Sequence, residues 1–339
     1  ETEPPATTEP LPEKLIFGFV PSERVETLGD AVQPYMDYLT QELGIPFEGV
    51  VTADYTGLVV AMGTGGAQFG AFGPVGYVQA AALYDNIGPL MQSARFGSFT
   101  YHGQWMTNDP AICTEPPIEG ALVNVDGVPT LLPADDPLVL AQQVGWAPEG
   151  DVPNATQEVL DDGTEVSKGL ACQAPISSVS GRKVAFGSPT STSATLYPTL
   201  QLIEAGIDLE NDIEASNLSP SHVAAIEAVY NGDFDFGTGF DDSRRNLRKP
   251  AEGGFADVGA KVIVFNLTPE IPNDVVAVDL NLPAQIIQAV YDATEKFLAT
   301  EEGFAVFQEI YEWTEIRPAV DSDFDVVRRL VAQLGVEGD

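Results

Sequence analysis

A run of three hydroxyl residues stands where a predicted strand gives way to a predicted helix: Ser191, Thr192 and Ser193. The first N–H groups of a helix have no intrahelical acceptor, and the helix dipole favours negative charge at that end. Hydroxyls and free N–H groups together suit a tetrahedral oxyanion. The nearest basic residues, Arg182 and Lys183, lie at the far end of the strand, so the segment predicts an anion site without a cation. The alternative is an ordinary N-cap, which needs only one such side chain.

Five further side chains stand at helix starts or at the ends of strand-like segments, and the tyrosines would not be singled out by their local pattern alone. His222 opens a predicted helix, and a histidine in a first turn points its ring beyond the helix end. Tyr55 stands at another predicted helix start, and Tyr101 ends a short strand-like segment. Asp242 and Asp274 each follow a strand-like segment. Each also has an ordinary interpretation. The histidine could cap its helix, the tyrosines could be packing residues whose hydroxyls contact solvent, and the aspartates could stabilise turns.

The elements that must position these residues alternate along the chain. Apolar runs and helical spacing predict strands at 15–20, 49–52, 68–72, 182–186 and 261–265, and helices at 26–43, 55–62, from about 191, and at 221–230. Such alternation favours an α/β fold with a largely parallel sheet. The C-terminal part, 283–335, is predicted to be helical throughout, with helices at 284–298, 303–311 and 324–334.

Several sequence blocks occur in a characteristic order along the chain. They are Ile16-Phe17-Gly18-Phe19-Val20-Pro21-Ser22-Glu23, Asp54-Tyr55, Phe69-Gly70-Ala71-Phe72-Gly73-Pro74, Pro189-Thr190-Ser191-Thr192-Ser193, His222 with Ala225-Ile226, and Ile271-Pro272-Asn273-Asp274. In this order they resemble the phosphonate/phosphite/phosphate-type substrate-binding proteins of ABC importers, which have the two-lobed class II periplasmic-binding fold with two crossings. The resemblance implies an extracytoplasmic solute-binding protein that captures a small phosphorus oxyanion for an importer permease.

The resemblance also implies which residues hold the ligand between the two lobes. In that family the Ser-Thr-Ser helix end holds phosphoryl oxygens, helped by a histidine and two tyrosines. Acidic residues bind the other end of the ligand or its protonated oxygen. The matching positions here are Tyr55, Tyr101, Ser191, Thr192, Ser193, His222, Asp242 and Asp274. Two positions depart from the family signature, because Ser188 replaces its Asp and Ala194 replaces its Gly.

The domain organisation follows from composition and from this resemblance. Residues 1–12 are rich in Pro, Thr and Glu and are expected to form a disordered tether. Lobe one is expected at 13–101 plus 275–339, and lobe two at 102–274. Lobe two is expected to include an insertion at about 103–177, rich in Pro, Asp and Gly, with a hairpin near 125–128.

The two cysteines of the chain, Cys113 and Cys172, both fall inside the expected insertion. In an exported protein two such cysteines usually form one disulfide, and we expect that bridge here. The alternative is a pair of unrelated free thiols.

The charge of the chain limits its partners. It has 51 acidic and 15 basic residues and a formal charge of −36, which argues against nucleic acid because such binding needs a basic face. No apolar stretch reaches the 18 or more residues of a membrane-spanning helix. No signal peptide is visible, as in a mature exported chain. We expect an extracytoplasmic monomer, lipid-anchored through a cysteine that is not in this chain.

The sequence gives little support to other functional classes. Ser191, His222 and an aspartate could be drawn as a hydrolase triad, but the serine lacks the Gly-x-Ser-x-Gly elbow. The two scattered histidines do not predict a metal site, and no cofactor is expected. The segment 63–66 lacks the Gly-Lys-Ser/Thr of a P-loop. A binding protein for a related oxyanion, such as an arsenic oxyanion, coupled to a membrane sensor remains the main alternative to an importer component.

Overall fold

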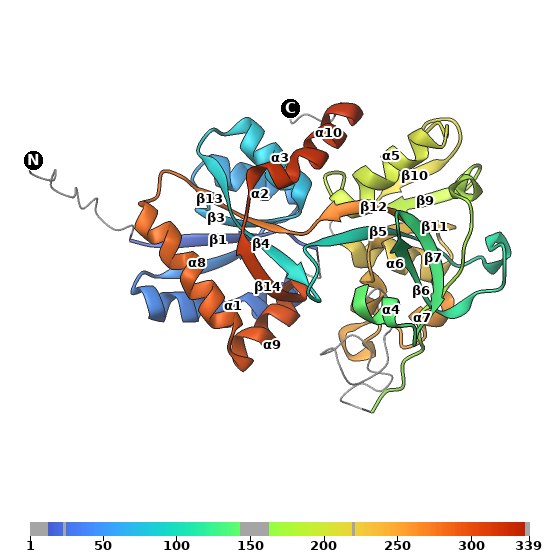
Figure 1. Ribbon diagram of the computed structural model, residues 1–339, viewed down its shortest axis with the longest axis horizontal. Helices are drawn as coiled ribbons and strands as arrows, with labels where there is room; N and C mark the ends of the chain where they lie inside the picture. Colours follow the sequence, from blue (N-terminus) through green and yellow to red (C-terminus); the bar gives the residue numbers. More distant parts are fainter. Residues whose placement is uncertain (1–12, 23–24, 143–162, 219–220, 336–339) are drawn as a thin grey trace, which may run out of the picture.

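Two β-sheets, each flanked by helices, lie side by side in the computed structural model (Figure 1). The structure describes residues 13–22, 25–142, 163–218 and 221–335. The predicted tether at 1–12 therefore lies outside the described residues, as does part of the expected insertion. Among the described helices, none is both long and apolar enough to cross a membrane.

The first sheet has six strands in the order β14-β4-β13-β3-β1-β2. Its strands are β1 (Leu15–Phe19), β2 (Phe47–Val51), β3 (Phe69–Phe72), β4 (Ile87–Arg95), β13 (Val275–Asp279) and β14 (Trp313–Pro318). Its helices are α1 (Val25–Leu43), α2 (Tyr55–Gly63), α3 (Pro74–Leu83), α8 (Ala284–Leu298), α9 (Glu301–Tyr311) and α10 (Asp325–Leu334). Strands β1, β2 and β3 pair in parallel, but β13 pairs antiparallel with β3 and β4, and β14 pairs antiparallel with β4. The α/β alternation is therefore confirmed, whereas the expectation of a largely parallel sheet is wrong, because the sheet is mixed.

The second sheet has eight strands in the order β10-β9-β11-β5-β12-β8-β6-β7. Its strands are β5 (Thr100–Thr107), β6 (Ile118–Val125), β7 (Val128–Pro133), β8 (Leu170–Ala171), β9 (Lys183–Phe186), β10 (Glu214–Asn217), β11 (Phe236–Phe240) and β12 (Ile263–Pro272). The helices of this part are α4 (Pro137–Gln142), α5 (Tyr197–Glu204), α6 (His222–Asn231) and α7 (Val258–Lys261). A π-helical turn, Thr192–Leu196, leads directly into α5.

The chain passes between the two sheets at two neighbouring points. It leaves β4 for β5 through the turn at Phe96 and Gly97, whose φ angles are 52° and 78°. It returns from β12 to β13 through Asn273 and Asp274. The Asn273 N–H donates to the Phe99 carbonyl at 2.8 Å, so the two crossings are bonded to each other. Two adjacent crossings of this kind can serve as a hinge.

Each sheet has its own apolar core. Aromatic rings dominate the first core, where Phe17, Tyr35, Phe297 and Phe307 contact one another. In the second sheet, Trp105 on β5 packs against the rings of neighbouring strands and is fully buried. Both cores bury enough aromatic surface to fix the strands that lead to the gap between the sheets.

Three sequence predictions can be compared directly with these elements. The disulfide is confirmed, because Cys113 and Cys172 are bridged. The hairpin is confirmed as β6 and β7, with Asp126 and Gly127 both at positive φ in the connecting turn. The three C-terminal helices are confirmed as α8, α9 and α10, but the region is not helical throughout, because Trp313–Pro318 forms strand β14 and pairs with β4 at the edge of the first sheet. Its two apolar residues, Trp313 and Ile316, are buried there.

The start of the expected insertion also differs from the structure. Strand β5 continues to Thr107 and lies between β11 and β12 in the middle of the second sheet. The residues 103–107 are therefore part of the central sheet, and the departure from regular α/β structure begins after them.

Candidate ligand-binding site

A small cavity lies between the two sheets, with a volume of about 30 Å³ open to the centres of water-sized groups. Both parts of the molecule contribute to its wall, which is formed by Val20, Ser22, Tyr55, Phe72, Gly73, Arg95, Tyr101, Ser191, Thr192, Ser193, His222, Phe240, Asp274 and Tyr311. About 10–15 Å³ of such space accommodates one water, so the cavity has room for a few heavy atoms. The structure thus brings together seven of the eight predicted site residues.

The predicted Ser-Thr-Ser helix end forms one side of the cavity. Ser191 is the N-cap, and its hydroxyl accepts a hydrogen bond from the Ala194 N–H at 3.3 Å. The capping interpretation therefore holds for this one serine. Thr192 and Ser193 are the first helical residues, so their N–H groups have no intrahelical acceptor. All three hydroxyl residues are at most 3% exposed, so their N–H groups and hydroxyls are shielded from solvent in the cavity wall.

Thr192 also links the two parts of the molecule. Its hydroxyl oxygen accepts a hydrogen bond at 3.0 Å from the N–H of Val75, in the first turn of α3. The hydroxyl proton remains available to a ligand, because the bond to Val75 uses only a lone pair. The neighbouring Ser193 carbonyl lies so near Gly103 on β5 that a Cβ there would stand 2.7 Å from it. Glycine at this position lets the helix end approach the sheet.

His222 begins α6 and turns its ring toward the cavity. Its Nε2 lies 3.4 Å from the Tyr55 hydroxyl, and the edge of Phe240 packs against the ring. Burial, together with the positive charge of Arg95, lowers the pKa of His222 to about 3. The imidazole is therefore neutral near pH 7 and offers one donor and one acceptor. Its Nδ1 is buried and has no hydrogen-bond partner among the described residues.

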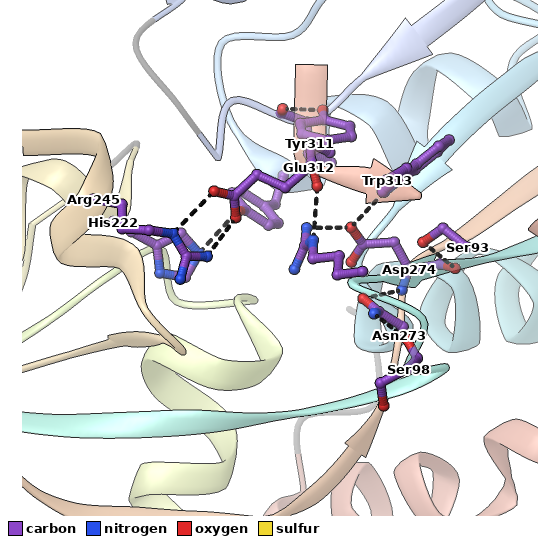
Figure 2. Close-up of polar contacts among 12 residues, drawn as sticks. Ser93, Ser98, His222, Arg245, Asn273, Asp274, Tyr311, Glu312 and Trp313 are labelled. Carbon is purple, nitrogen blue, oxygen red and sulfur yellow. Dashed lines mark hydrogen bonds and ion pairs between the residues drawn. The ribbon is translucent and has the colours of Figure 1, made fainter. Parts of the chain in front are cut away.

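A buried ion pair forms the opposite side of the cavity. Arg95, the last residue of β4, donates to Oδ2 of Asp274 at 2.6 Å and to the Tyr311 carbonyl at 2.8 Å. Trp313 donates weakly to the same carboxylate oxygen at 3.4 Å (Figure 2). The expectation of an anion site without a cation is wrong, because Arg95 lines the cavity. Arg95 is far from the hydroxyl run in the sequence and lies beside the first crossing, so no local pattern connects it with Ser191–Ser193.

Tyr101 follows that crossing and lies next to the ion pair. The guanidinium carbon of Arg95 is 5.6 Å from the centre of the Tyr101 ring. Burial raises the pKa of the Tyr101 hydroxyl, and the Asp274 carboxylate raises it further, whereas Arg95 and a hydrogen bond with Ser193 oppose the rise. The hydroxyl therefore stays protonated and is a neutral donor at the cavity wall.

The comparisons with known proteins point in one direction. A family model described as "ABC transporter, phosphonate, periplasmic substrate-binding protein" matches residues 17–324. The chain belongs to this family. It is 28% identical over 242 residues to "Phosphate-import protein PhnD" of Mycolicibacterium smegmatis. That match covers 69% of this chain and 57% of the relative, so this chain spans little more than half of the relative's length.

Solved structures agree with the fold of this phosphonate-binding family. A binding protein component of an ABC phosphonate transporter from Pseudomonas aeruginosa aligns with a TM-score of 0.66 at 16% identity, over 94% of this chain and 85% of that one. PhnD1 from Prochlorococcus marinus, solved in complex with methylphosphonate, aligns with a TM-score of 0.69 at 15% identity, over 95% and 98% of the two chains. At these identities the likeness concerns the two-lobed α/β fold.

Asp242 is the predicted site residue that the structure places outside the cavity. Its side chain is fully buried, and both carboxylate oxygens bind Arg244, with Nη2 to Oδ2 at 2.5 Å. It also caps the following turn by accepting from the Arg244 N–H at 3.0 Å. The Arg244 guanidinium lowers the pKa of Asp242, although burial opposes this as the largest single effect. Its charge is therefore balanced within the protein.

The neighbouring Asp241 has a different environment. It lines a second pocket of about 170 Å³, together with Tyr101 and Glu270. Burial raises the pKa of Asp241 to about 8, against the opposing effects of the His102 backbone and the charges of Arg245 and Arg95. At neutral pH this carboxyl group therefore tends to carry a proton. Of these two adjacent aspartates, Asp241 lines the second pocket, whereas Asp242 is held by Arg244.

Proposed function

We propose that this chain captures a small phosphorus oxyanion, namely a phosphonate, phosphite or phosphate, and delivers it to the permease of an ABC importer. The observation that carries the proposal is the arrangement of the cavity wall. The N–H groups of Thr192 and Ser193, which have no intrahelical acceptor, and the hydroxyls of both residues line the same small space as the neutral ring of His222 and the Arg95–Asp274 pair. Such donors suit the oxygens of a tetrahedral anion.

The charge of the cavity wall supports a ligand that carries a proton. Arg95 and Asp274 cancel each other, and His222 is neutral, so the wall is close to neutral before a ligand enters. Arg95 occupies Oδ2 of Asp274, which leaves Oδ1 as an acceptor for a ligand O–H. A hydrogen phosphate, hydrogen phosphonate or hydrogen phosphite can donate that bond. Sulfate cannot, and its oxygens would meet a carboxylate instead.

The size of the cavity supports a ligand with a small substituent. About 30 Å³ of space for water-sized centres suits an oxyanion carrying hydrogen, hydroxyl or methyl at the fourth position. The names of similar proteins agree with this range, since one relative is called a phosphate-import protein and one solved structure holds methylphosphonate.

The partner and location of the protein follow from the same proposal. The family consists of periplasmic substrate-binding components, so we place the chain outside the cytoplasm, as a monomer without catalytic activity. We keep the proposed division into lobe one, 13–101 plus 275–339, and lobe two, 102–274, with the cavity between them. Lipid anchoring through a cysteine outside this sequence also remains part of the proposal.

Calorimetric titration tests this function directly. The purified chain is titrated with phosphate, phosphite, methylphosphonate, aminoethylphosphonate, arsenate and sulfate. We expect at least one of the first three to bind with a dissociation constant of about 1 μM or lower, near −8 kcal/mol, and sulfate to bind at least a hundredfold more weakly. The proposal fails if none of the phosphorus anions binds, or if a bound anion is chemically converted.

A further inference from the structure

An ion pair outside the cavity connects the two sheets directly. Arg245 follows β11 of the eight-stranded sheet, and Glu312 joins α9 to β14 of the six-stranded sheet. Nε of Arg245 donates to Oε1 of Glu312 at 3.1 Å, and Nη2 donates to Oε2 at 2.8 Å. Figure 2 shows the two side chains reaching toward each other. The geometry is bidentate, which makes the pair strong and directional.

The arginine of this pair is held firmly on its own side. Its side chain is 2% exposed, whereas that of Glu312 is 22% exposed. The guanidinium carbon lies 4.9 Å from the ring centre of Phe96, in the turn where the chain crosses between the sheets. The backbone N–H of Arg245 donates to the Asp242 carbonyl at 3.1 Å, and the buried Asp242–Arg244 pair fixes that turn. A buried arginine needs its carboxylate partner, because an unpaired buried charge is costly.

The glutamate of this pair belongs to a segment that also builds the cavity. The residue before it, Tyr311, accepts from Arg95 through its carbonyl and donates from its hydroxyl to the Val20 carbonyl at 2.6 Å. The residue after it, Trp313, donates to the Asp274 carboxylate (Figure 2). The three consecutive residues therefore have one contact each of this kind: Tyr311 contacts the cavity cation, Glu312 contacts the opposite sheet, and Trp313 contacts the cavity carboxylate. Separating Arg245 from Glu312 would disturb this segment as the sheets move apart.

We propose that Arg245 and Glu312 form a clasp between the two lobes that slows release of the captured ligand, a role that rests on the proposed function. Release requires the lobes to separate, and separation breaks the bidentate pair. In the ligand-free chain, joined lobes with the pair made exchange with separated lobes in which it is broken, and capture starts from the separated form. Loss of the clasp therefore raises the dissociation rate and leaves the association rate nearly unchanged, as is usual when a buried charge pair at an interface is truncated. The two residues position the lobes and do not contact the ligand.

The test uses Glu312→Asn and Glu312→Gln in the full chain. Glu312 has a φ of 57°, a conformation that asparagine tolerates well, so Glu312→Asn removes the carboxylate without new backbone strain. Stopped-flow dissociation is measured with phosphate, phosphite and methylphosphonate as probes. We expect the dissociation rate constant to rise at least tenfold and the association rate constant to change less than about threefold.

The matched control is Asp323→Asn, which removes the exposed Arg317–Asp323 ion pair of the same C-terminal region. It should leave both rate constants at their wild-type values. High salt should also raise the wild-type dissociation rate, because salt screens the partly exposed Glu312, and should have less effect on Glu312→Asn. A purely structural role of Glu312 would lower the melting temperature without producing this difference between the two rate constants.

Small-angle scattering of the ligand-free protein tests the clasp independently of any anion. Glu312→Asn should have a larger radius of gyration than the wild type and the Asp323→Asn control. An unchanged radius of gyration, or unchanged dissociation of a bound probe, overturns the clasp. Failure of all three anions to bind the wild type would instead overturn the proposed function, and the scattering comparison would still decide the clasp. If Glu312→Asn fails to fold, the same measurements are made on Glu312→Gln and on Arg245→Lys, which keeps the charge but loses the bidentate geometry.

Discussion

Arg95 and Asp274 are 179 residues apart in the sequence, yet their side chains meet at 2.6 Å inside the cavity. Each stands beside one of the two crossings between the sheets. Their charges cancel, so the cavity can receive an anion without becoming strongly negative or strongly positive. Under the proposed function, this relationship favours a ligand that carries a proton.

Asp274→Asn tests whether the carboxylate accepts a hydrogen bond from a ligand O–H group. The variant leaves the Arg95 charge unbalanced and replaces a pure acceptor with an amide that can also donate. Binding of the preferred phosphorus anion should weaken about tenfold or more, near the 1.5–3 kcal/mol of a hydrogen bond to a charged group. Sulfate binding should improve. Titration of both anions gives the ratio, and an unchanged phosphorus-to-sulfate ratio would contradict the assignment.

Asp242→Asn is the counterpart outside the cavity. Its carboxylate is bound by Arg244, so the substitution breaks a fully buried ion pair. We expect a loss of about 3–5 kcal/mol of unfolding free energy, as for other buried pairs that lose one partner. The phosphorus-to-sulfate ratio should stay at its wild-type value. Urea unfolding measures the loss of stability, and titration of the same sample measures the anion preference. An altered phosphorus-to-sulfate ratio would show that Asp242 belongs to the ligand-binding site.

Thr192→Ala tests the helix end. The substitution removes a hydroxyl donor from the cavity and the acceptor for the Val75 N–H. Anion binding should weaken by roughly 1.5–3 kcal/mol, as expected for one hydrogen bond to a charged group. Thr199→Ala, further along α5 and outside the cavity wall, is the matched control. Equal affinity of Thr192→Ala and wild type for every phosphorus anion would show that the helix end is not the anion site.

The local pattern at the hydroxyl run, together with the order of sequence blocks that resembles the family, was sufficient to predict most of the residues that line the cavity. The Ser191–Ser193 hydroxyl run, His222 and Tyr55 all lie at helix starts, and a helix start can be recognised from a few neighbouring residues. Arg95 could not be found in this way, because its role depends on a long-range contact with Asp274. Pairing across the fold leaves no local pattern.

The errors of the sequence analysis have similar physical causes. Asp241 and Asp242 are adjacent, and only the backbone path after β11 decides which carboxyl group points to a cavity wall and which to Arg244. Strand β14 was missed because it follows directly after α9 and carries only two buried apolar residues, at Trp313 and Ile316. Its pairing with β4, not its own composition, makes it a strand.

The disulfide should stabilise more of the fold than the insertion that contains it. Cys172 is fully buried, packs in the core cluster of Trp105 and Phe265, and its N–H donates to the Val264 carbonyl. With a sequence separation of 59, the chain-entropy model gives roughly 4 kcal/mol. Replacing both cysteines with alanine should lower the unfolding free energy by about that amount, measured by urea unfolding. Mass spectrometry of the non-reduced wild type should find no alkylatable thiol; two such thiols would refute the bridge.

Asp241→Asn tests the raised pKa through the pH dependence of stability. Burial raises the pKa of Asp241 from 3.8 to about 8 in the folded protein. Below pH 3.8 the carboxyl is protonated in both states, so its contribution to stability is fully present there. Between pH 4 and 8 the folded state holds a proton that the unfolded state has lost, so wild-type stability falls as pH rises, by at most about 1.4 kcal/mol per pH unit from this group.

Asparagine cannot ionise, so Asp241→Asn should lack this fall. Its stability should be close to that of wild type near pH 4 and exceed it near pH 8, because the variant buries no group that must either charge or hold a proton. Urea unfolding across this pH range measures the difference. Asp30→Asn, at an exposed position on α1, is the control and should run parallel to wild type. If the Asp241→Asn curve also runs parallel to wild type, Asp241 titrates alike in the folded and unfolded chains, and its burial does not control its charge.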